Sequence, residues 1–274
     1  MLRTKERKMS YLLKDENQLS SWIQKEVTLE ETIGQGKRGL AARRIQEWLN
    51  LYGMGIDIDD AFGNITASKV KQFQIDHNLS ATGVVDKQTF RELVSPMLNV
   101  LRQIPITDDE ATFGEVVASY ARAHLAEHPM EIGGQNCGPW VRLYMEGNQG
   151  SQWAWCAGFV KFLLKQTGET VEAGMPIAGS FSCDSLAAQG ERIGHFVSET
   201  DISSGRVKIQ DLIPGSIFLV RRTPEDWTHT GIVTQFNEDS FDTIEGNTND
   251  DGHREGYEVC ARMRGYKNKD FIRM

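Results

Sequence analysis

The chain has 274 residues, of which 39% are hydrophobic and 25% are charged, as in a soluble globular protein of about two domains. Its net charge of −8 is carried by residues 99–274, and such an acidic half argues against nucleic-acid binding, which needs a basic face. No apolar run approaches the roughly 18 residues of a membrane-spanning helix, so we expect no membrane insertion.

Residues 1–33 are predicted to be a polar lead-in with one short amphipathic helix. The apolar residues that share one helix face are Leu19, Trp22, Ile23 and Val27. Basic residues open the chain without an apolar stretch after them, so no secretory signal peptide is predicted. We therefore expect synthesis in the cytoplasm and action elsewhere only after release or delivery.

Residues 34–97 are predicted to form an all-α module of three helices. The apolar stripes are Leu40, Ile45, Trp48 and Leu49, then Val70, Phe73 and Ile75, then Phe90, Leu93 and Val94. Thr66 and Asp86 are predicted to lie at or near the N-caps of the second and third helices. The acidic run Asp57–Asp60 is not a calcium loop, because Ser68 stands where the closing Glu belongs.

Residues 98–114 are the predicted linker, and residues 115–274 are the predicted second domain. A helix is expected from residue 115, with Val116, Tyr120, Ala123 and Leu125 facing inwards and Pro129 after its end. A second helix is expected over 157–166, ended by Gly168. Residues 214–220 are expected to form a turn followed by an apolar strand, and further strands are expected over 229–236 and 241–246, which form a hairpin.

Cys156 directly precedes the helix expected over 157–166. A free cysteine is often only a small buried hydrophobe. At a helix N-terminus, however, the unpaired N–H groups and the positive end of the dipole favour a thiolate. Cys137 is a rival nucleophile, but it precedes Gly-Pro, which is typical of a turn.

A thiolate nucleophile needs a base and a group that orients the base. If the hairpin loop has three residues, Phe236 faces Ser240 and Gly231 faces Glu245, so Glu245 lies diagonally beside His229. His229 is then the predicted base, with Glu245 and Asn247 as orienting residues. Gly231 would leave the space between His229 and Glu245 free. The backbone N–H of Cys156 would form an oxyanion hole together with Gln152 or Asn136.

No metal or other cofactor is predicted. Cys183 and His195 suggest half of a zinc site, but no further ligands stand at a recognised spacing.

Dispersed residues of the first module follow the order found in a known family. They are Ile45-Gln46 with Leu49, Asp60-Ala-Phe62-Gly63 with Thr66, Val70 with Phe73-Gln74, Asn78-Leu79, Thr82-Gly83-Val84-Val85-Asp86, Thr89 and Leu93. In these residues the segment resembles the peptidoglycan-binding type 1 domain. The resemblance implies a three-helix fold and peptidoglycan as the partner.

Short motifs of the second half also follow a known order. They are Trp155-Cys156-Ala157 with Phe159-Val160, Pro214-Gly215, His229-Thr-Gly231-Ile-Val233 and Glu245-Gly-Asn247. Here the chain resembles the CHAP and NlpC/P60 amidases, which are papain-like cysteine peptidases of cell walls, and Glu-x-Asn favours CHAP. The resemblance implies a Cys-His-Glu arrangement assisted by Asn247. Ser216 departs from the family, where many members have an acidic residue.

The predicted fold is therefore two-domain, with an all-α three-helix peptidoglycan-binding module and an α+β papain-like domain that contains an antiparallel sheet. The predicted function is hydrolysis of a wall amide, in the stem peptide or at the muramoyl-alanine link, with Trp153, Trp155 and Trp227 binding substrate. A phage endolysin or an antibacterial effector fits, with a holin, a secretion machinery or an immunity protein as further partners. The alternatives are an inactive wall-binding protein and a cysteine protease that acts on proteins.

Overall fold

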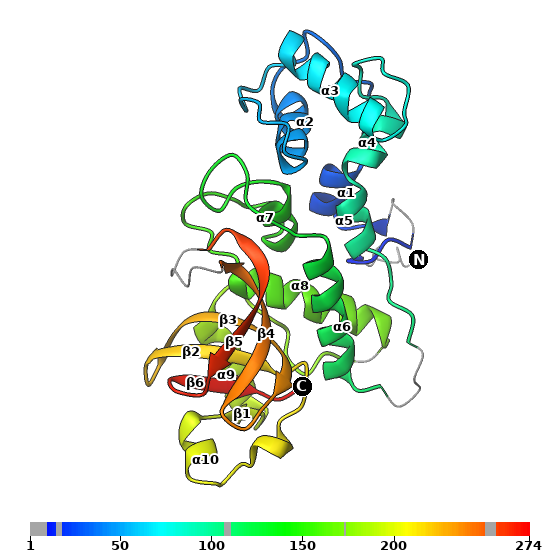
Figure 1. Cartoon of the computed structure of the whole chain (residues 1–274). Helices are drawn as coiled ribbons and strands as arrows, with labels where there is room; N and C mark the ends of the chain where they lie inside the picture. Colours follow the sequence, from blue (N-terminus) through cyan, green and yellow to red (C-terminus); the bar gives the residue numbers. More distant parts are fainter. Residues whose placement is uncertain (1–9, 15–17, 107–110, 173, 250–255) are drawn as a thin grey trace, which may run out of the picture. The chain divides into compact units, whose positions relative to one another are not determined.

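The structure, a computed structural model, describes residues 10–14, 18–106, 111–172, 174–249 and 256–274 (Figure 1). Parts of the predicted lead-in, linker and second domain lie outside these ranges. The chain divides into two compact units. Unit 1 comprises Met1–Arg102 and Met130–Ser151, and unit 2 comprises Gln103–Pro129 and Gln152–Met274. This grouping differs from the predicted single domain over 115–274, because residues 130–151 belong with the N-terminal unit.

Unit 1 is helical in its described part. Its helices are α1 (Ser21–Val27), α2 (Leu40–Leu51), α3 (Asn64–Asp76), α4 (Lys87–Leu93), α5 (Ser95–Val100) and α7 (Pro139–Tyr144). The predicted amphipathic helix of the lead-in is α1, and α2, α3 and α4 are the three predicted helices. Helix α2 packs against α3 and α4, and α7 packs against α1 and α2. Residues 130–151 join unit 1 through these last contacts.

Most of the predicted apolar stripes form the core of unit 1, but two of their members do not. Leu40 is 70% exposed and Ile75 is 58% exposed, so their assignment to the core is wrong. Leu40 is the first residue of α2 and Ile75 is the second-last residue of α3. Both side chains lie at a helix end and are open to solvent.

The helix starts in unit 1 use different caps. Asp86 caps α4 as predicted, and its carboxylate accepts from the Thr89 N–H at 2.8 Å. Thr66 lies near the start of α3 as predicted, but it is not the cap, because α3 begins at Asn64 and has Gly63 at its N-cap. Thr66 is buried inside the helix, where its hydroxyl lies 3.4 Å from the Gln46 amide nitrogen.

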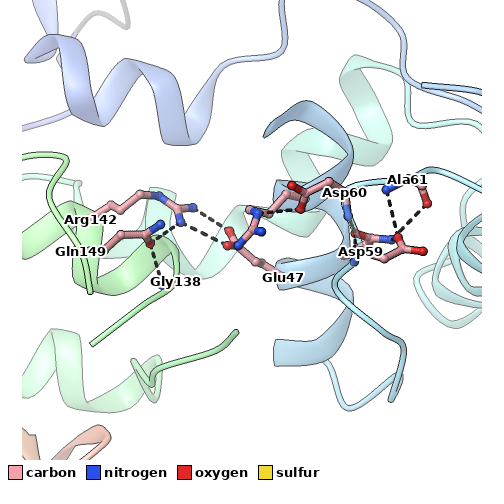
Figure 2. Close-up of polar contacts among 9 residues, drawn as sticks. Glu47, Asp59, Asp60, Ala61, Gly138, Arg142 and Gln149 are labelled. Atoms are coloured by element: carbon pink, nitrogen blue, oxygen red, sulfur yellow. Dashed lines mark hydrogen bonds and ion pairs between the residues drawn. The ribbon is translucent and has the colours of Figure 1, made fainter. Parts of the chain in front are cut away.

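A buried polar network holds residues 130–151 in unit 1 (Figure 2). The Arg142 guanidinium binds the carboxylate of Glu47 at 2.7 Å and that of Glu26 at 2.8 Å. The Gln149 side-chain oxygen accepts from Arg142 at 2.8 Å and from the Gly138 N–H at 3.1 Å. Burial disfavours the charge of Arg142, but Glu26 and Glu47 outweigh it and raise its pKa. Each buried charge of this network therefore has a partner.

Unit 2 combines helices with one antiparallel sheet. The helices are α6 (Phe113–Ala126), α8 (Cys156–Thr170), α9 (Cys183–Arg192), α10 (Glu199–Ser203) and the 3-10 turn η2 (Ile209–Asp211). The strands are β1 (Phe196–Val197), β2 (Ile217–Thr223), β3 (Asp226–Phe236), β4 (Ser240–Thr248), β5 (Glu258–Gly265) and β6 (Lys269–Ile272), in the order β1-β6-β2-β3-β4-β5 within the described residues. The predicted helices followed by an antiparallel sheet are confirmed.

Helix α8 packs against β3 and β4, and α6 packs against α8 and these strands (Figure 1). Trp155 and Phe159 are fully buried at this contact. Gly246 of β4 makes the close approach possible, because a Cβ there would lie 2.7 Å from the Trp155 ring and 2.8 Å from Phe159. Gly168 lies inside α8, so the prediction that it ends the helix is wrong.

The β3–β4 hairpin contains one extra residue in β3. Ile232 pairs with Ile244, which is the predicted register, but Phe236 pairs with Phe241 instead of the predicted Ser240. The ladder shifts between Val233 and Gln235. On the side of this irregularity that leads towards His229, the strands pair in the predicted register.

No helix in the described residues is long and apolar enough to cross a membrane.

Candidate active site

Cys156 is the first residue of α8 and is 5% exposed. Its thiol is hydrogen-bonded to Cys183, to His229 and to the backbone N–H of Ala157. The hydrogen bond with Cys183 lowers the pKa of Cys156 most, burial opposes it, and the His229 hydrogen bond and charge lower the pKa further. The pKa of Cys156 is consequently well below its ordinary range. The site thus favours a thiolate at the N-terminus of α8.

His229 lies on β3 and connects Cys156 with Glu245. The Nε2 atom of His229 is 2.7 Å from Oε2 of Glu245, so Nδ1 is the ring nitrogen left for the Cys156 thiol. Burial disfavours the imidazolium, but the hydrogen bonds and charges of Cys156 and Glu245 outweigh it and raise the pKa of His229 to about 9. A thiolate paired with an imidazolium is therefore favoured at neutral pH.

Glu245 on β4 is fully buried and is held by two residues besides His229. Arg264 of β5 donates from Nη2 to Oε2 at 2.5 Å and from Nε to Oε1. The Thr243 hydroxyl donates to Oε1 at 2.6 Å. Burial raises the pKa of Glu245, but Arg264 and His229 outweigh it and bring the pKa to about 2. Glu245 is an anion with both carboxylate oxygens occupied, which fixes the orientation of His229.

Gly231 lies where β3 and β4 approach each other between His229 and Glu245. A Cβ at this position would lie 2.8 Å from the Phe218 ring and 2.9 Å from both Glu245 Cγ and the Ile244 oxygen. Any side chain would therefore displace Glu245 or its neighbours. The absence of a side chain at Gly231 leaves room beside it as predicted, and the Glu245 side chain fills part of that room.

Asn247 does not join the contact between His229 and Glu245. It has a positive φ of 53° and is 7% exposed. Its side-chain oxygen has no hydrogen-bond partner among the described residues. Glu245 is therefore the residue that orients His229 here, and the assisting role predicted for Asn247 has no contact that supports it.

The two predicted oxyanion donors lie in different parts of the chain. Gln152 belongs to unit 2, is exposed and precedes Cys156 by four positions. Asn136 belongs to unit 1, where its side-chain amide donates to the Ser151 carbonyl at 3.3 Å. The Asn136 amide already serves a loop of unit 1, and Gln152 is the candidate that remains in the unit of Cys156.

The three tryptophans predicted to bind substrate differ in exposure. Trp155 is fully buried and Trp227 is 9% exposed, with its indole N–H donating to Asp270 at 2.8 Å. Burial of these two rings in the core argues against the substrate-binding role predicted for them. Trp153 is partly exposed and contacts the Phe181 ring edge-on, so it is the one with a face available to a ligand.

Cys137 is not activated as Cys156 is. It lies in unit 1, and its thiol donates to the Gln135 carbonyl at 3.3 Å. Burial and the charge of Glu131 raise the pKa of Cys137. Cys137 therefore remains a thiol where Cys156 favours the thiolate.

This contrast predicts selective alkylation. At pH 6.5 iodoacetamide is expected to modify Cys156 at least about tenfold faster than Cys137, because only thiolates react and Cys137 is nearly all protonated. Mass spectrometry of the peptides that contain each cysteine would give both rates in one sample. Equal rates, or faster modification of Cys137, would contradict the thiolate at Cys156.

Sequence reasoning did not identify Cys183, Arg264 or Thr243 as members of this site. Thr243 lies two residues before Glu245 in a strand, and this spacing on one face is the signal that was available. Among the described residues, no group of three or more His, Cys, Asp or Glu side chains is placed to hold a metal ion.

Comparison with known proteins identifies one part of the chain. Residues 38–93 match the model of the peptidoglycan binding domain family, which confirms the resemblance predicted for the first module. A structure of a fused Zn-dependent amidase/peptidase/peptidoglycan-binding domain-containing protein from Clostridium acetobutylicum is 26% identical, with a TM-score of 0.24. That match covers 36% of this chain and 47% of the other, so this chain spans less than half of that protein. A search of curated proteins finds no match.

Proposed function

We propose that this protein is a peptidoglycan hydrolase that cleaves an amide bond of the cell wall with Cys156 as the nucleophile. The observation that carries the proposal is the connected set of Cys156, His229 and Glu245 in a chain whose residues 38–93 match a peptidoglycan binding domain. The resemblance of the second half to the papain-like CHAP amidases supports the same reading.

The reaction begins when the Cys156 thiolate attacks the carbonyl carbon of the amide. The new S–C bond forms while the carbonyl π electrons move to oxygen, and the oxyanion accepts hydrogen bonds from the Cys156 N–H and from Gln152. As the C–N bond breaks, the His229 imidazolium gives its proton to the leaving amine. His229 then accepts a proton from water while the water oxygen attacks the thioester carbonyl carbon. The C–S bond breaks, which releases the carboxylic acid and restores the Cys156 thiolate beside the His229 imidazolium. Glu245 remains an anion and holds the imidazole throughout.

Unit 1 supplies the wall-binding part of the proposal. A module that binds the polymer raises the local concentration of amide bonds for a covalently linked catalytic unit, without adding contacts in the site. The biological setting that we propose is lysis by a phage endolysin or attack by an antibacterial effector, with the wall reached after release or delivery.

Digestion of purified sacculi tests the proposal. The protein is expected to release soluble muropeptides that carry one new amine and one new carboxylate per cut, and mass spectrometry of these products would identify the bond. Sacculi that bind the protein but stay intact would leave only a wall-binding protein. Cleavage of a denatured protein substrate with intact sacculi would favour a protease.

The titration of the site predicts a bell-shaped pH dependence of hydrolysis. Activity needs the Cys156 thiolate, whose pKa is lowered, and the His229 imidazolium, whose pKa is about 9. Activity is therefore expected to rise with pH on an acid limb set by Cys156, below the range of an ordinary cysteine. It should fall through about pH 9 as His229 loses its proton. Initial rates on solubilised peptidoglycan between pH 4 and pH 10 would measure it, and a rate still rising above pH 9 would contradict the assignment.

A further inference from the structure

A second buried thiol touches the nucleophile. Cys183 is the first residue of α9, is 8% exposed and is hydrogen-bonded to the sulfur of Cys156. Neither of these two cysteines is part of a disulfide. The Cys-His-Glu set does not require this residue, so its contact with the reacting atom needs its own explanation.

The start of α9 is fixed to the strand that carries His229. Asp184 accepts from the backbone N–H of Trp227 at 2.8 Å, two residues before His229 on β3. The Ser182 hydroxyl caps α9 by accepting from the Ser185 N–H at 3.3 Å. Helix α9 also packs closely, since a Cβ on Gly190 would lie 2.9 Å from the Ile272 side chain. Cys183 is thus held in place by contacts that do not involve Cys156.

The direction of the hydrogen bond follows from the charges around the pair. The hydrogen bond with Cys156, burial, and the negative charges of Cys156 and Asp184 all raise the pKa of Cys183, so it keeps its proton. Cys156 is the partner that loses its proton, because His229 and the Ala157 N–H also stabilise its anion. Cys183 is therefore the donor and Cys156 the acceptor.

A buried thiolate needs such donors. Removing an anion from water is unfavourable unless hydrogen bonds replace the lost solvation. Cys156 has three donors from three elements: His229 from β3, the Ala157 N–H from α8, and the thiol of Cys183 from α9. Only the Cys183 donor is a neutral side chain that neither gives nor takes a proton in the reaction described above.

We propose that Cys183 is a further catalytic residue, whose S–H group donates to the Cys156 sulfur and holds it as a thiolate aimed at the substrate carbonyl. The role rests on the proposed function. When the S–C bond forms, the sulfur loses its negative charge and the Cys183 hydrogen bond weakens. When the thioester is hydrolysed and the thiolate returns, the hydrogen bond forms again. The Cys183 proton stays on Cys183 throughout, so the reaction remains balanced without it.

Replacement of Cys183 by alanine and by serine separates hydrogen bonding from packing. The pH dependence of Cys156 alkylation by iodoacetamide would be measured in a phosphine reductant, with peptide-resolved mass spectrometry. Cys183→Ala is expected to move the acid limb upwards by about one pH unit, and so to slow alkylation about tenfold at pH values well below that limb. Cys183→Ser keeps a donor of similar size and is expected to stay near the native profile.

Two results would overturn the proposal. Cys183→Ala with the native profile would show that the thiol does not stabilise the anion. Equal shifts in the alanine and serine variants would show that packing, and not the donated hydrogen bond, is responsible. Thermal unfolding of both variants would show whether either has lost its fold. If the alanine variant does not fold, the alkylation profile of the serine variant is the one that tests the role of Cys183.

The same measurements keep this role distinct from the proposed function. Alkylation does not use peptidoglycan, so the Cys183 contact is tested even if the native protein leaves sacculi intact. If sacculi are digested and the alkylation profile of Cys183→Ala is unchanged, the hydrolase proposal stands and the role of Cys183 fails. On sacculi, Cys183→Ala should lose more activity at pH 6 than at pH 8, since the thiolate fraction recovers as pH rises.

Discussion

Replacing Cys156 with alanine is expected to lower the rate of peptidoglycan hydrolysis by at least about 10³-fold, because the thiolate that forms the covalent intermediate is lost. The measurement is release of soluble muropeptides from sacculi over time. Binding to sacculi should be unchanged, since residues 38–93 match the peptidoglycan binding domain and Cys156 lies in unit 2. Circular dichroism would verify that the variant is folded.

Cys137→Ala is the matched control for this experiment. It removes a cysteine of unit 1 whose pKa is raised, and whose thiol contacts only a local carbonyl among the hydrogen bonds found. We expect hydrolysis by this variant to stay within about twofold of the native rate, as for a substitution outside the reacting groups. Loss of activity in Cys137→Ala, with activity retained in Cys156→Ala, would identify the other cysteine as the nucleophile.

Replacing Arg142 with methionine is expected to destabilise unit 1 by about 3–5 kcal/mol, because it leaves the buried Glu47 carboxylate without its guanidinium partner and leaves the buried Glu26 carboxylate with only the longer 3.5 Å contact to Arg44. Glu26 and Glu47 are 2% and 1% exposed, and each is bound by the Arg142 guanidinium. Urea unfolding followed by tryptophan fluorescence would measure the change, with the transition of unit 1 analysed separately because two units need not unfold together.

Arg43→Met provides the control in the same unit. Arg43 pairs with Asp60 at 2.7 Å, but the side chains are 32% and 40% exposed, so the pair should contribute only about 0–1 kcal/mol. The triple variant Arg142→Met, Glu26→Gln and Glu47→Gln should recover part of the loss, since no unpaired buried charge remains. Equal destabilisation by Arg142→Met and Arg43→Met would contradict the importance of burial.

Local patterns were enough to locate the elements that carry the site. The position of Cys156 before an apolar run of helical period placed it at the start of α8. The alternation of residues in two strands placed His229 and Glu245 on one face of a hairpin. These features depend on neighbours within a few positions along the chain, which a single sequence displays.

The strand register of the β3–β4 hairpin could not be predicted fully from local patterns. Counting back from a three-residue loop paired Phe236 with Ser240, whereas Phe236 pairs with Phe241 and the ladder shifts between Val233 and Gln235. An irregularity of one residue depends on how β3 packs against its neighbours, and strand alternation does not encode it. The approach of His229 to Glu245 required both the local pattern and this shift.

Contacts across elements account for what the sequence did not predict. Arg264 reaches Glu245 only because β5 pairs with β4, and Cys183 reaches Cys156 only because α9 is fixed to β3. The burial of Trp155 and Trp227, which argues against their predicted contact with substrate, likewise depends on packing.

By itself, the sequence determined the helical module with its peptidoglycan-binding resemblance, the helix start at Cys156 and the strands of His229 and Glu245, because each is set by spacing along the chain. Only the tertiary structure decided that residues 130–151 belong to unit 1 and which groups set the charges of the site. The physical reason is that a buried charge depends on every donor and acceptor around it. For Arg142, Glu245 and Cys156, those partners come from distant positions in the chain.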